Sequence, residues 1–328
     1  DLDLYHPWNI TAEQAIELAT ETEDAARRVD PRIENSEGGT VFTNAGMRMK
    51  ANTDGFMAGY KSSYHSLSCA VIGKQGEEMQ RDFWSWSARD RADLMSAAEV
   101  GRIAGERTVR RLGTQSLSTR EVPVIYAADI AGSLFGHFIS AVSGNSLYRK
   151  ASFLLDHLGK PVFPAFMRIH EQPLLHKAIG SAPYDSEGVA TCARDIVTDG
   201  VLQGYVLNSY AARRLGMQTT GNAGGVRNLT IEPGDKDLQA LLGSMDTGLL
   251  VTELIGFGVN NVTGDYSRGA AGFWVEGGEI QYPVDEITVA GNLKDMFMKI
   301  VEVGNDVDLR GNTRTGSVLI EQMMVAGA

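Results

Sequence analysis

The chain has 328 residues, of which 43% are hydrophobic and 22% charged, a composition that is typical of folded globular proteins and excludes a disordered tail. Its formal net charge of −11 disfavours direct binding of nucleic acids, because phosphate-binding surfaces need clustered Lys and Arg side chains. No apolar run is long enough to span a membrane, and the only cysteines, Cys69 and Cys192, lie far apart in the sequence, so we expect a cytoplasmic protein that binds neither membrane nor nucleic acid.

The first 114 residues are predicted to form one α+β domain. Thr11 followed by Gln14 is a capping-box pattern, and it predicts a helix from about 12 to 28. Short β-prone runs separated by turn signals predict an antiparallel meander over 32–86, and a second helix follows over about 93–112. The polar stretch TQSLSTREV marks the predicted boundary between domains 1–114 and 115–328.

Residues 115–328 are predicted to form a second α+β domain. It begins with the apolar strand VPVIYAADI and a helix over about 132–142. The pairs Asp199-Gly200 and Gly277-Gly278 predict two hairpins, and a helix over 292–304 and a strand over 317–325 complete the domain. Because strands and helices do not alternate regularly, the predicted fold class is α+β with mostly antiparallel sheets rather than doubly wound α/β.

The segment RIHEQPLLH, residues 168–176, contains two histidines and a glutamate and raises the question of a zinc peptidase. A zinc-binding peptidase helix needs His-Glu-x-x-His, because residues four apart share one face. His170 and His176 are six residues apart, and Pro173 between them would break the helix. The segment therefore predicts the end of a strand and the turn after it, not a metal site.

Two glycine-rich stretches stand out, TGNAGG over 220–225 and TGDYSRGAAG over 263–272. One interpretation is a pair of tight loops, because glycine permits backbone conformations that other residues avoid. The other is a groove in which exposed backbone groups pair with an extended peptide. Asp265 and Arg268 could form an ion pair or hold a peptide terminus. The candidate peptide-binding residues in these stretches are Gly221, Asn222, Gly224, Gly225, Asp265, Tyr266 and Arg268.

Three stretches of the sequence follow one another along the chain: YDSEGVATCARDIVTDGVLQGYVLNSYAARRLGMQTTGNAGG, TGDYSRGAAGFWVEGGEIQYPVDEITVAGNLKDM and VGNDV. In composition and order they resemble the TldD/PmbA family, and specifically its PmbA branch, also called TldE. The resemblance covers essentially the whole chain. It implies a middle domain over about 1–114 and a C-terminal domain over about 115–328, without the family's N-terminal domain.

The TldD branch of the family carries His-Glu-x-x-x-His on a helix, and a cysteine near the C-terminus completes its zinc site. The resemblance places Gly136, His137 and Ala141 where the first histidine, the glutamate and the second histidine would stand. The late loop RGNTRTGSV offers Thr313, Arg314 and Thr315 but no cysteine. The resemblance therefore implies no catalytic, cofactor-binding or metal-binding residue in this chain, and zinc only on a TldD-like partner.

What the resemblance implies is a noncatalytic subunit that pairs with a TldD-like metalloprotease and helps to enclose a chamber where small or unfolded peptides are cleaved. In the family, such cleavage matures a peptide antibiotic precursor and removes an unstable antitoxin. Without its partner, the chain is expected to form a homodimer. One alternative is a regulator of DNA gyrase that acts through protein contacts. The other is a stand-alone peptidase or hydrolase with an unrecognised site built from His65, His137, Asp185, Glu187 or Asp265.

Overall fold

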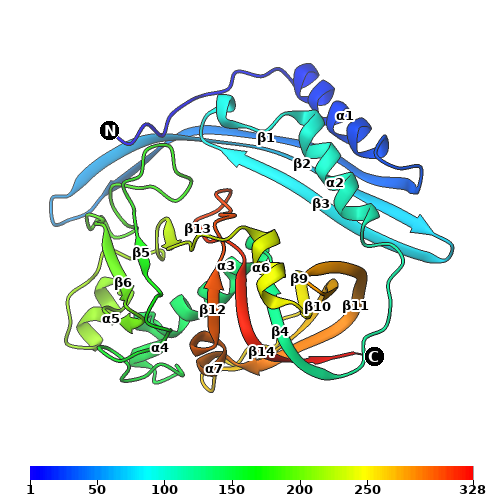
Figure 1. The fold of residues 1–328 in the computed structure, drawn as a ribbon. Coiled ribbons are helices and arrows are strands. Elements are labelled where there is room, and N and C mark those ends of the chain that lie inside the picture. Colours follow the sequence, from blue (N-terminus) through cyan, green and yellow to red (C-terminus); the bar gives the residue numbers. More distant parts are fainter. Residues whose placement is uncertain (328) are drawn as a thin grey trace. The chain divides into compact units, whose positions relative to one another are not determined.

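The computed structural model describes residues 1–327, and the chain divides into two compact units (Figure 1). The first unit is Asp1–Thr114 with Leu175–Ser181, and the second is Gln115–Leu174 with Ala182–Ala328. Each unit has a hydrophobic core of its own. Within residues 1–327, no helix combines the length and the apolar character needed to cross a bilayer.

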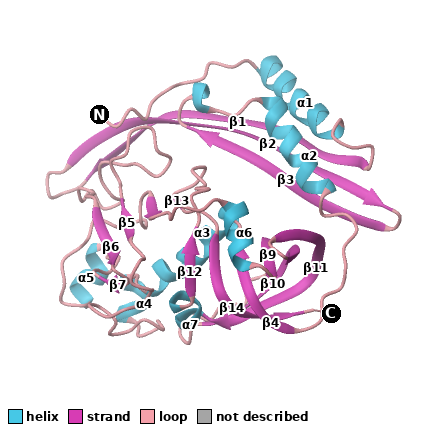
Figure 2. Cartoon of the chain, viewed as in Figure 1, coloured by secondary structure: helices cyan, strands magenta, loops and turns pink. Residues whose placement is uncertain are grey.

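The first unit is a three-stranded antiparallel sheet with two helices on one face (Figure 2). The strand order is β1–β2–β3. Alternate side chains of the central strand are buried, and Cys69 and Val71 pack against Ala26 and Ala104 of the two helices. The elements are α1 (Ala12–Arg27), β1 (Ile33–Ala51), β2 (Met57–Gln75), β3 (Glu78–Ala88), the 3-10 helix η1 (Arg91–Asp93) and α2 (Ala97–Val109).

The local predictions for this unit are confirmed. Helix α1 begins at a capping box in which the Gln14 backbone N–H donates to Thr11 Oγ1 and the Thr11 backbone N–H donates to Gln14 Oε1. The predicted meander is the β1–β3 sheet. The second predicted helix is α2, capped by Ser96, with η1 just before it.

The second unit contains two sheets. The larger has the strand order β11–β10–β9–β4–β14–β12, and the smaller has the order β13–β8–β5–β6–β7. The elements are β4 (Arg120–Tyr126), α3 (Ala128–Ala141), α4 (Gly144–Tyr148), β5 (Ile169–Glu171), β6 (Arg194–Thr198), β7 (Val201–Leu202), α5 (Ser209–Arg214), β8 (Leu229–Ile231), α6 (Leu238–Met245), β9 (Gly248–Ile255), β10 (Asp265–Glu276), β11 (Glu279–Asn292), α7 (Leu293–Met298), β12 (Ile300–Val303), β13 (Thr313–Arg314) and β14 (Val318–Ala326).

The larger sheet is covered by helices on both faces. Strand β11 also pairs with β14, so that β11, β10, β9, β4 and β14 form a closed ring. Along β9, Leu249 and Val251 belong to the core cluster that contains Phe135 and Phe138 of α3. Leu250, between them, belongs to the cluster that contains the buried side chains of α6. This alternation places α3 on one face of the sheet and α6 on the other.

Both predicted hairpins of this unit are present. Asp199 and Gly200, between β6 and β7, have φ angles of 51° and 73°, as a type I′ turn requires. Gly277 and Gly278 likewise have positive φ angles between β10 and β11. The α+β class with mostly antiparallel pairing is confirmed, and the parallel pairings are β4 with β9 and β13 with β8.

One predicted helix is wrong in its second half. The sequence predicts a helix over 292–304, whereas α7 ends at Met298 and Ile300–Val303 form β12. Ile300, Val301 and Val303 are β-branched, and β12 pairs with β14 of the larger sheet. The short helices α4, α5 and α6 were not predicted from the sequence.

Candidate functional site

The helix that the resemblance places at the TldD-type metal motif is α3. It lies beside β13, the strand in the late loop where the cysteine ligand would stand. A Cβ atom at Gly132 of α3 would be 3.5 Å from the side chain of Thr313. The two segments implied by the resemblance are therefore neighbours in this fold.

The two histidine positions of the motif point in different directions. Gly136 is exposed, and a Cβ atom there would have no neighbour within 4 Å. Ala141 is 0% exposed and belongs to the main core cluster. Positions five residues apart on an α-helix are separated by about 140° around its axis. Glycine and alanine carry no side-chain nitrogen, oxygen or sulfur, so neither position supplies a metal ligand.

His137 is the one imidazole on α3, and it lies against β10. Its ring meets the ring of Tyr266 edge to face, with 6.0 Å between the ring centroids. Tyr266 and Arg268 are two residues apart on β10, so both side chains lie on the same face of the sheet. The structure thus brings together three residues that the sequence singled out separately.

These three residues and Tyr126 of β4 form what we call the His137 cluster. Tyr126 is 0% exposed and Tyr266 is 2% exposed. The Tyr126 hydroxyl donates to Met323 Sδ at 3.6 Å, and Arg268 Nη2 donates to the Leu254 carbonyl at 3.4 Å.

The cluster contains unused hydrogen-bonding capacity. Among residues 1–327, His137 Nε2, the Tyr266 hydroxyl and Arg268 Nε are buried without a partner in hydrogen-bonding geometry. Burial raises the pKa of Tyr266. The neighbouring Tyr126 and Arg268 lower this pKa, but by less than burial raises it. Buried polar atoms without partners cost free energy, and such sites are often functional. Tyr126 was missed in the sequence because it lies in an apolar strand.

The pKa of His137 should make stability depend on pH. Burial lowers this pKa, and the Arg268 guanidinium lowers it further. The unfolded chain then binds a proton at a higher pH than the folded chain, so the free energy of unfolding falls as pH drops below about 6.5 and stops falling below the folded pKa. We expect His137→Gln to make this fall shallower in urea denaturation between pH 8 and pH 5. An identical pH profile for both proteins would contradict the assignment.

The residues of this region do not fit a zinc ion. A catalytic zinc site needs three nitrogen, oxygen or sulfur ligands from the protein. Glycine, alanine and threonine stand at the implied ligand positions, and the cationic Arg268 beside His137 opposes a metal cation. Cys69 is buried, Cys192 is exposed, and both are free. Over residues 1–327, no group of three or more His, Cys, Asp or Glu side chains is placed to hold a metal ion.

The glycine-rich loop over 220–225 is held from inside by Glu171, which is 2% exposed. The Glu171 carboxylate accepts hydrogen bonds from Arg194 Nε at 3.2 Å, from Asn222 Nδ2 at 2.8 Å and from the Arg227 backbone N–H at 2.7 Å. Asn222 is 5% exposed, so its side chain belongs to this network and not to the surface. Positive φ angles occur at Gly221, Gly224 and Gly225.

In the second glycine-rich stretch, Asp265 and Arg268 have different partners. The Asp265 carboxylate accepts hydrogen bonds from Thr263 Oγ1 at 2.6 Å and from Asn292 Nδ2 at 3.2 Å. Arg268 instead contacts the β9 backbone, as described above. Asp265 therefore shapes its own loop, whereas Tyr266 and Arg268 belong to the His137 cluster.

Apart from His137, the residues considered for a stand-alone catalytic site each take part in a local hydrogen-bond network of their own unit. His65 lies in the first unit, where its two ring nitrogens contact Thr43 Oγ1 and the His6 carbonyl, each at 2.8 Å. Asp185 accepts hydrogen bonds from three backbone N–H groups, and Glu187 accepts one from Ser209, where α5 begins.

The histidines of RIHEQPLLH belong to different units. His170 lies on β5 in the second unit, and its Nδ1 is 3.6 Å from Glu232 Oε2. His176 belongs to the segment Leu175–Ser181 of the first unit. The glutamate between them is Glu171, the centre of the buried network, so this segment is structural.

Comparisons with known proteins agree with this reading of the fold. Two family models match, the PmbA/TldA metallopeptidase central domain over residues 5–112 and the C-terminal domain over residues 119–327. Metalloprotease PmbA of Escherichia coli O157:H7 is 50% identical over 327 residues, which are 100% of this chain and 73% of that protein. The Metalloprotease PmbA homolog of Haemophilus influenzae is 48% identical over 328 residues, with the same two shares.

A solved structure has the same fold. The crystal structure of a candidate modulator of DNA gyrase from Bacteroides thetaiotaomicron superposes with a TM-score of 0.95 at 31% identity, over 100% of this chain and 75% of that chain. The family models together match almost all of the sequence, and half of its residues are identical to those of a PmbA protein. The chain therefore belongs to the PmbA/TldD metallopeptidase family, on its PmbA (TldE) branch.

Proposed function

We propose that this chain is the noncatalytic subunit of a two-subunit peptidase, in which a TldD-like metalloprotease holds the zinc ion and cleaves small or unfolded peptides. The observation that carries the proposal is the chemistry of α3 and β13. The two segments adjoin, but Gly136, His137, Ala141 and Thr313 cannot supply the three ligands of a zinc site.

The role proposed for this chain is to complete the enclosure around the partner's zinc site. A second subunit can wall off a catalytic chamber and present backbone groups to an extended peptide. Enclosure selects substrates by size, which favours flexible chains over folded proteins.

A peptidase assay with three arms tests the proposal: this chain alone, a TldD-like partner alone, and the equimolar mixture, each with an unfolded peptide substrate. We expect cleavage only in the mixture. Treating the partner with a chelator and then removing the chelator should abolish cleavage by the mixture. The same treatment of this chain should have no effect, because no catalytic metal is proposed on it.

The stand-alone alternative makes the opposite prediction. Cleavage by this chain alone, lost on chelation or in His137→Ala, would overturn the proposal and place the active site on α3. We further propose that the chain without its partner forms a homodimer. A monomer in sedimentation at micromolar concentration would contradict that part and leave the assay's conclusion unaffected.

A further inference from the structure

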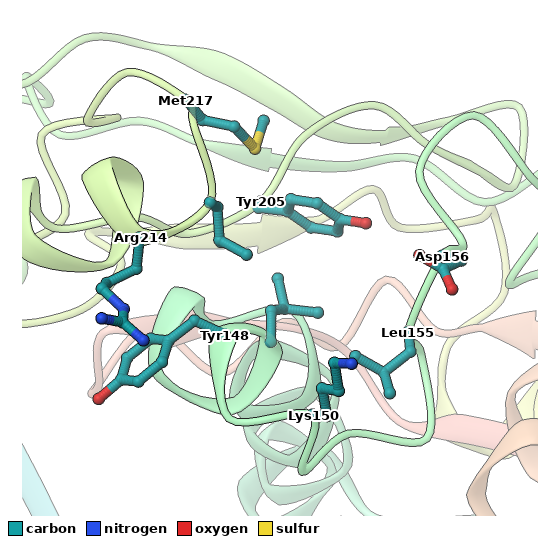
Figure 3. Close-up of a pocket in the computed structure, with 9 residues that line it drawn as sticks. Tyr148, Lys150, Leu155, Asp156, Tyr205, Arg214 and Met217 are labelled. Atoms are coloured by element: carbon teal, nitrogen blue, oxygen red, sulfur yellow. The ribbon is translucent and has the colours of Figure 1, made fainter.

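A pocket of about 510 Å³ lies in the second unit, between α4, α5 and the segment that follows α4 (Figure 3). Its apolar lining comes from Leu147, Leu155, Leu215 and Met217. Pockets of roughly 300 to 1,000 Å³ are the usual size for small-molecule ligands. None of the residues that line it belongs to the His137 cluster.

Charged side chains of both signs line this pocket. Arg214 and Asp156 lie on opposite sides of it in Figure 3, and Lys150 lies along its lower edge. The Arg214 guanidinium is 5.7 Å from the centre of the Tyr148 ring, a cation–π contact that helps to fix its position. Within residues 1–327, no ion pair is formed by Arg214, Asp156 or Lys150.

The backbone holds two of these charges in uncommon conformations. Lys150 follows α4 with a φ of 57°, and the bonds from Lys150 N–H to the Leu147 carbonyl and from Ala151 N–H to the Ser146 carbonyl form a Schellman motif. Glycine is the usual residue at that position, because a side chain there is strained. Asp156 also has a positive φ, of 58°. Strained residues other than glycine tend to gather at functional sites.

We propose that this pocket binds a dipeptide with apolar side chains and free ends. Its carboxylate would face Arg214, its ammonium group would face Asp156 on the opposite side, and its side chains would cover the leucine and methionine lining. Opposite charges at the two sides of an apolar pocket match the two ends of a zwitterion. The inference stands without the proposed function, although peptide cleavage is the class of reaction that would supply this ligand.

Isothermal titration calorimetry with the whole chain tests the proposal, with leucyl-leucine as the probe. Two further probes each lack one charge: N-acetyl-leucyl-leucine has no ammonium group, and leucyl-leucine amide has no carboxylate. Because Asp156 is exposed and water screens its charge, we expect Asp156→Asn to weaken the binding of leucyl-leucine about threefold and to leave the binding of N-acetyl-leucyl-leucine unchanged. Arg214→Gln should weaken the binding of leucyl-leucine by a similar factor and leave the binding of leucyl-leucine amide unchanged.

The matched control is Arg213→Gln, which removes the same charge from the neighbouring residue of α5. Arg213 and Arg214 are both exposed, but only Arg214 lines the pocket. We expect it to bind leucyl-leucine as the unmodified chain does. No heat from leucyl-leucine at millimolar concentration would overturn the proposal, and so would equal losses in Arg213→Gln and Arg214→Gln. The calorimetry does not depend on the peptidase assay. Failure of the ligand proposal for this pocket can therefore be told apart from failure of the two-subunit proposal.

Discussion

Replacing Gly272 with alanine should lower the free energy of unfolding by about 3 kcal/mol. Gly272 lies on β10, which pairs with β9 on one side and β11 on the other. A Cβ atom there would be 1.9 Å from the Leu250 carbonyl oxygen and 3.0 Å from the Val251 Cα atom. Because β10 is held on both sides, it cannot move away without breaking one of the two pairings. Urea denaturation followed by circular dichroism measures the change.

Gly136→Ala is the matched control, because it makes the same chemical change where there is room. Gly136 lies in the interior of α3, and its Cβ position is open. Alanine is the better helix former, so the free energy of unfolding should rise by about 0.5 to 1 kcal/mol. A similar loss in both variants would show that the close approach of β9 to β10 is not what requires glycine at position 272.

Replacing Glu171 with alanine should lower the free energy of unfolding by about 3 to 5 kcal/mol. The change removes the carboxylate that Arg194, Asn222 and the Arg227 backbone share. Arg194 Nε and the Arg227 backbone N–H lose their acceptor, while Asn222 Nδ2 keeps only its bond to the Gly225 carbonyl. The glycine-rich loop over 220–225 should loosen at the same time. Faster amide hydrogen exchange in that loop, measured together with urea denaturation, checks both effects.

An exposed ion pair on the same sheet provides the control for Glu171. Asp195 of β6 pairs with Arg168 at 3.2 Å, and the two side chains are 37% and 52% exposed. Water screens such a pair, so Asp195→Asn should change the free energy of unfolding by less than about 1 kcal/mol. If Glu171→Ala costs no more than Asp195→Asn, the buried network does not hold the loop.

The parts of the fold that the sequence predicts well are those with local signals. The start of α1 follows from Thr11 and Gln14, and the turn between β6 and β7 follows from Asp199 and Gly200. Strand β12 could not be predicted in this way, because Ile300–Val303 become a strand by pairing with β14, which lies later in the chain. Pairing between distant segments overrides local helix propensity.

The sequence identified individual residues of the candidate site but not which of them lie together in the fold. His137, Tyr266 and Arg268 each stood out in the sequence, but their proximity depends on how α3 packs over β10, which no local pattern encodes. Asn222 was a candidate peptide-binding residue of its glycine-rich loop, but its side chain is buried in a hydrogen-bond network. The sequence of a glycine-rich loop does not show whether its side chains are exposed or buried. Glu171 was seen as part of an accidental zinc motif because its buried partners lie more than 20 residues away along the chain.

The most direct test of the central claim is to locate the zinc in a mixture of this chain with a TldD-like subunit. Native mass spectrometry of the complex, followed by separation of the two chains and measurement of the metal in each, gives the answer. We predict a complex of the two chains in which zinc remains with the partner and this chain carries none. Stoichiometric zinc on this chain, retained when it is isolated, would contradict the account and make α3 part of a metal site.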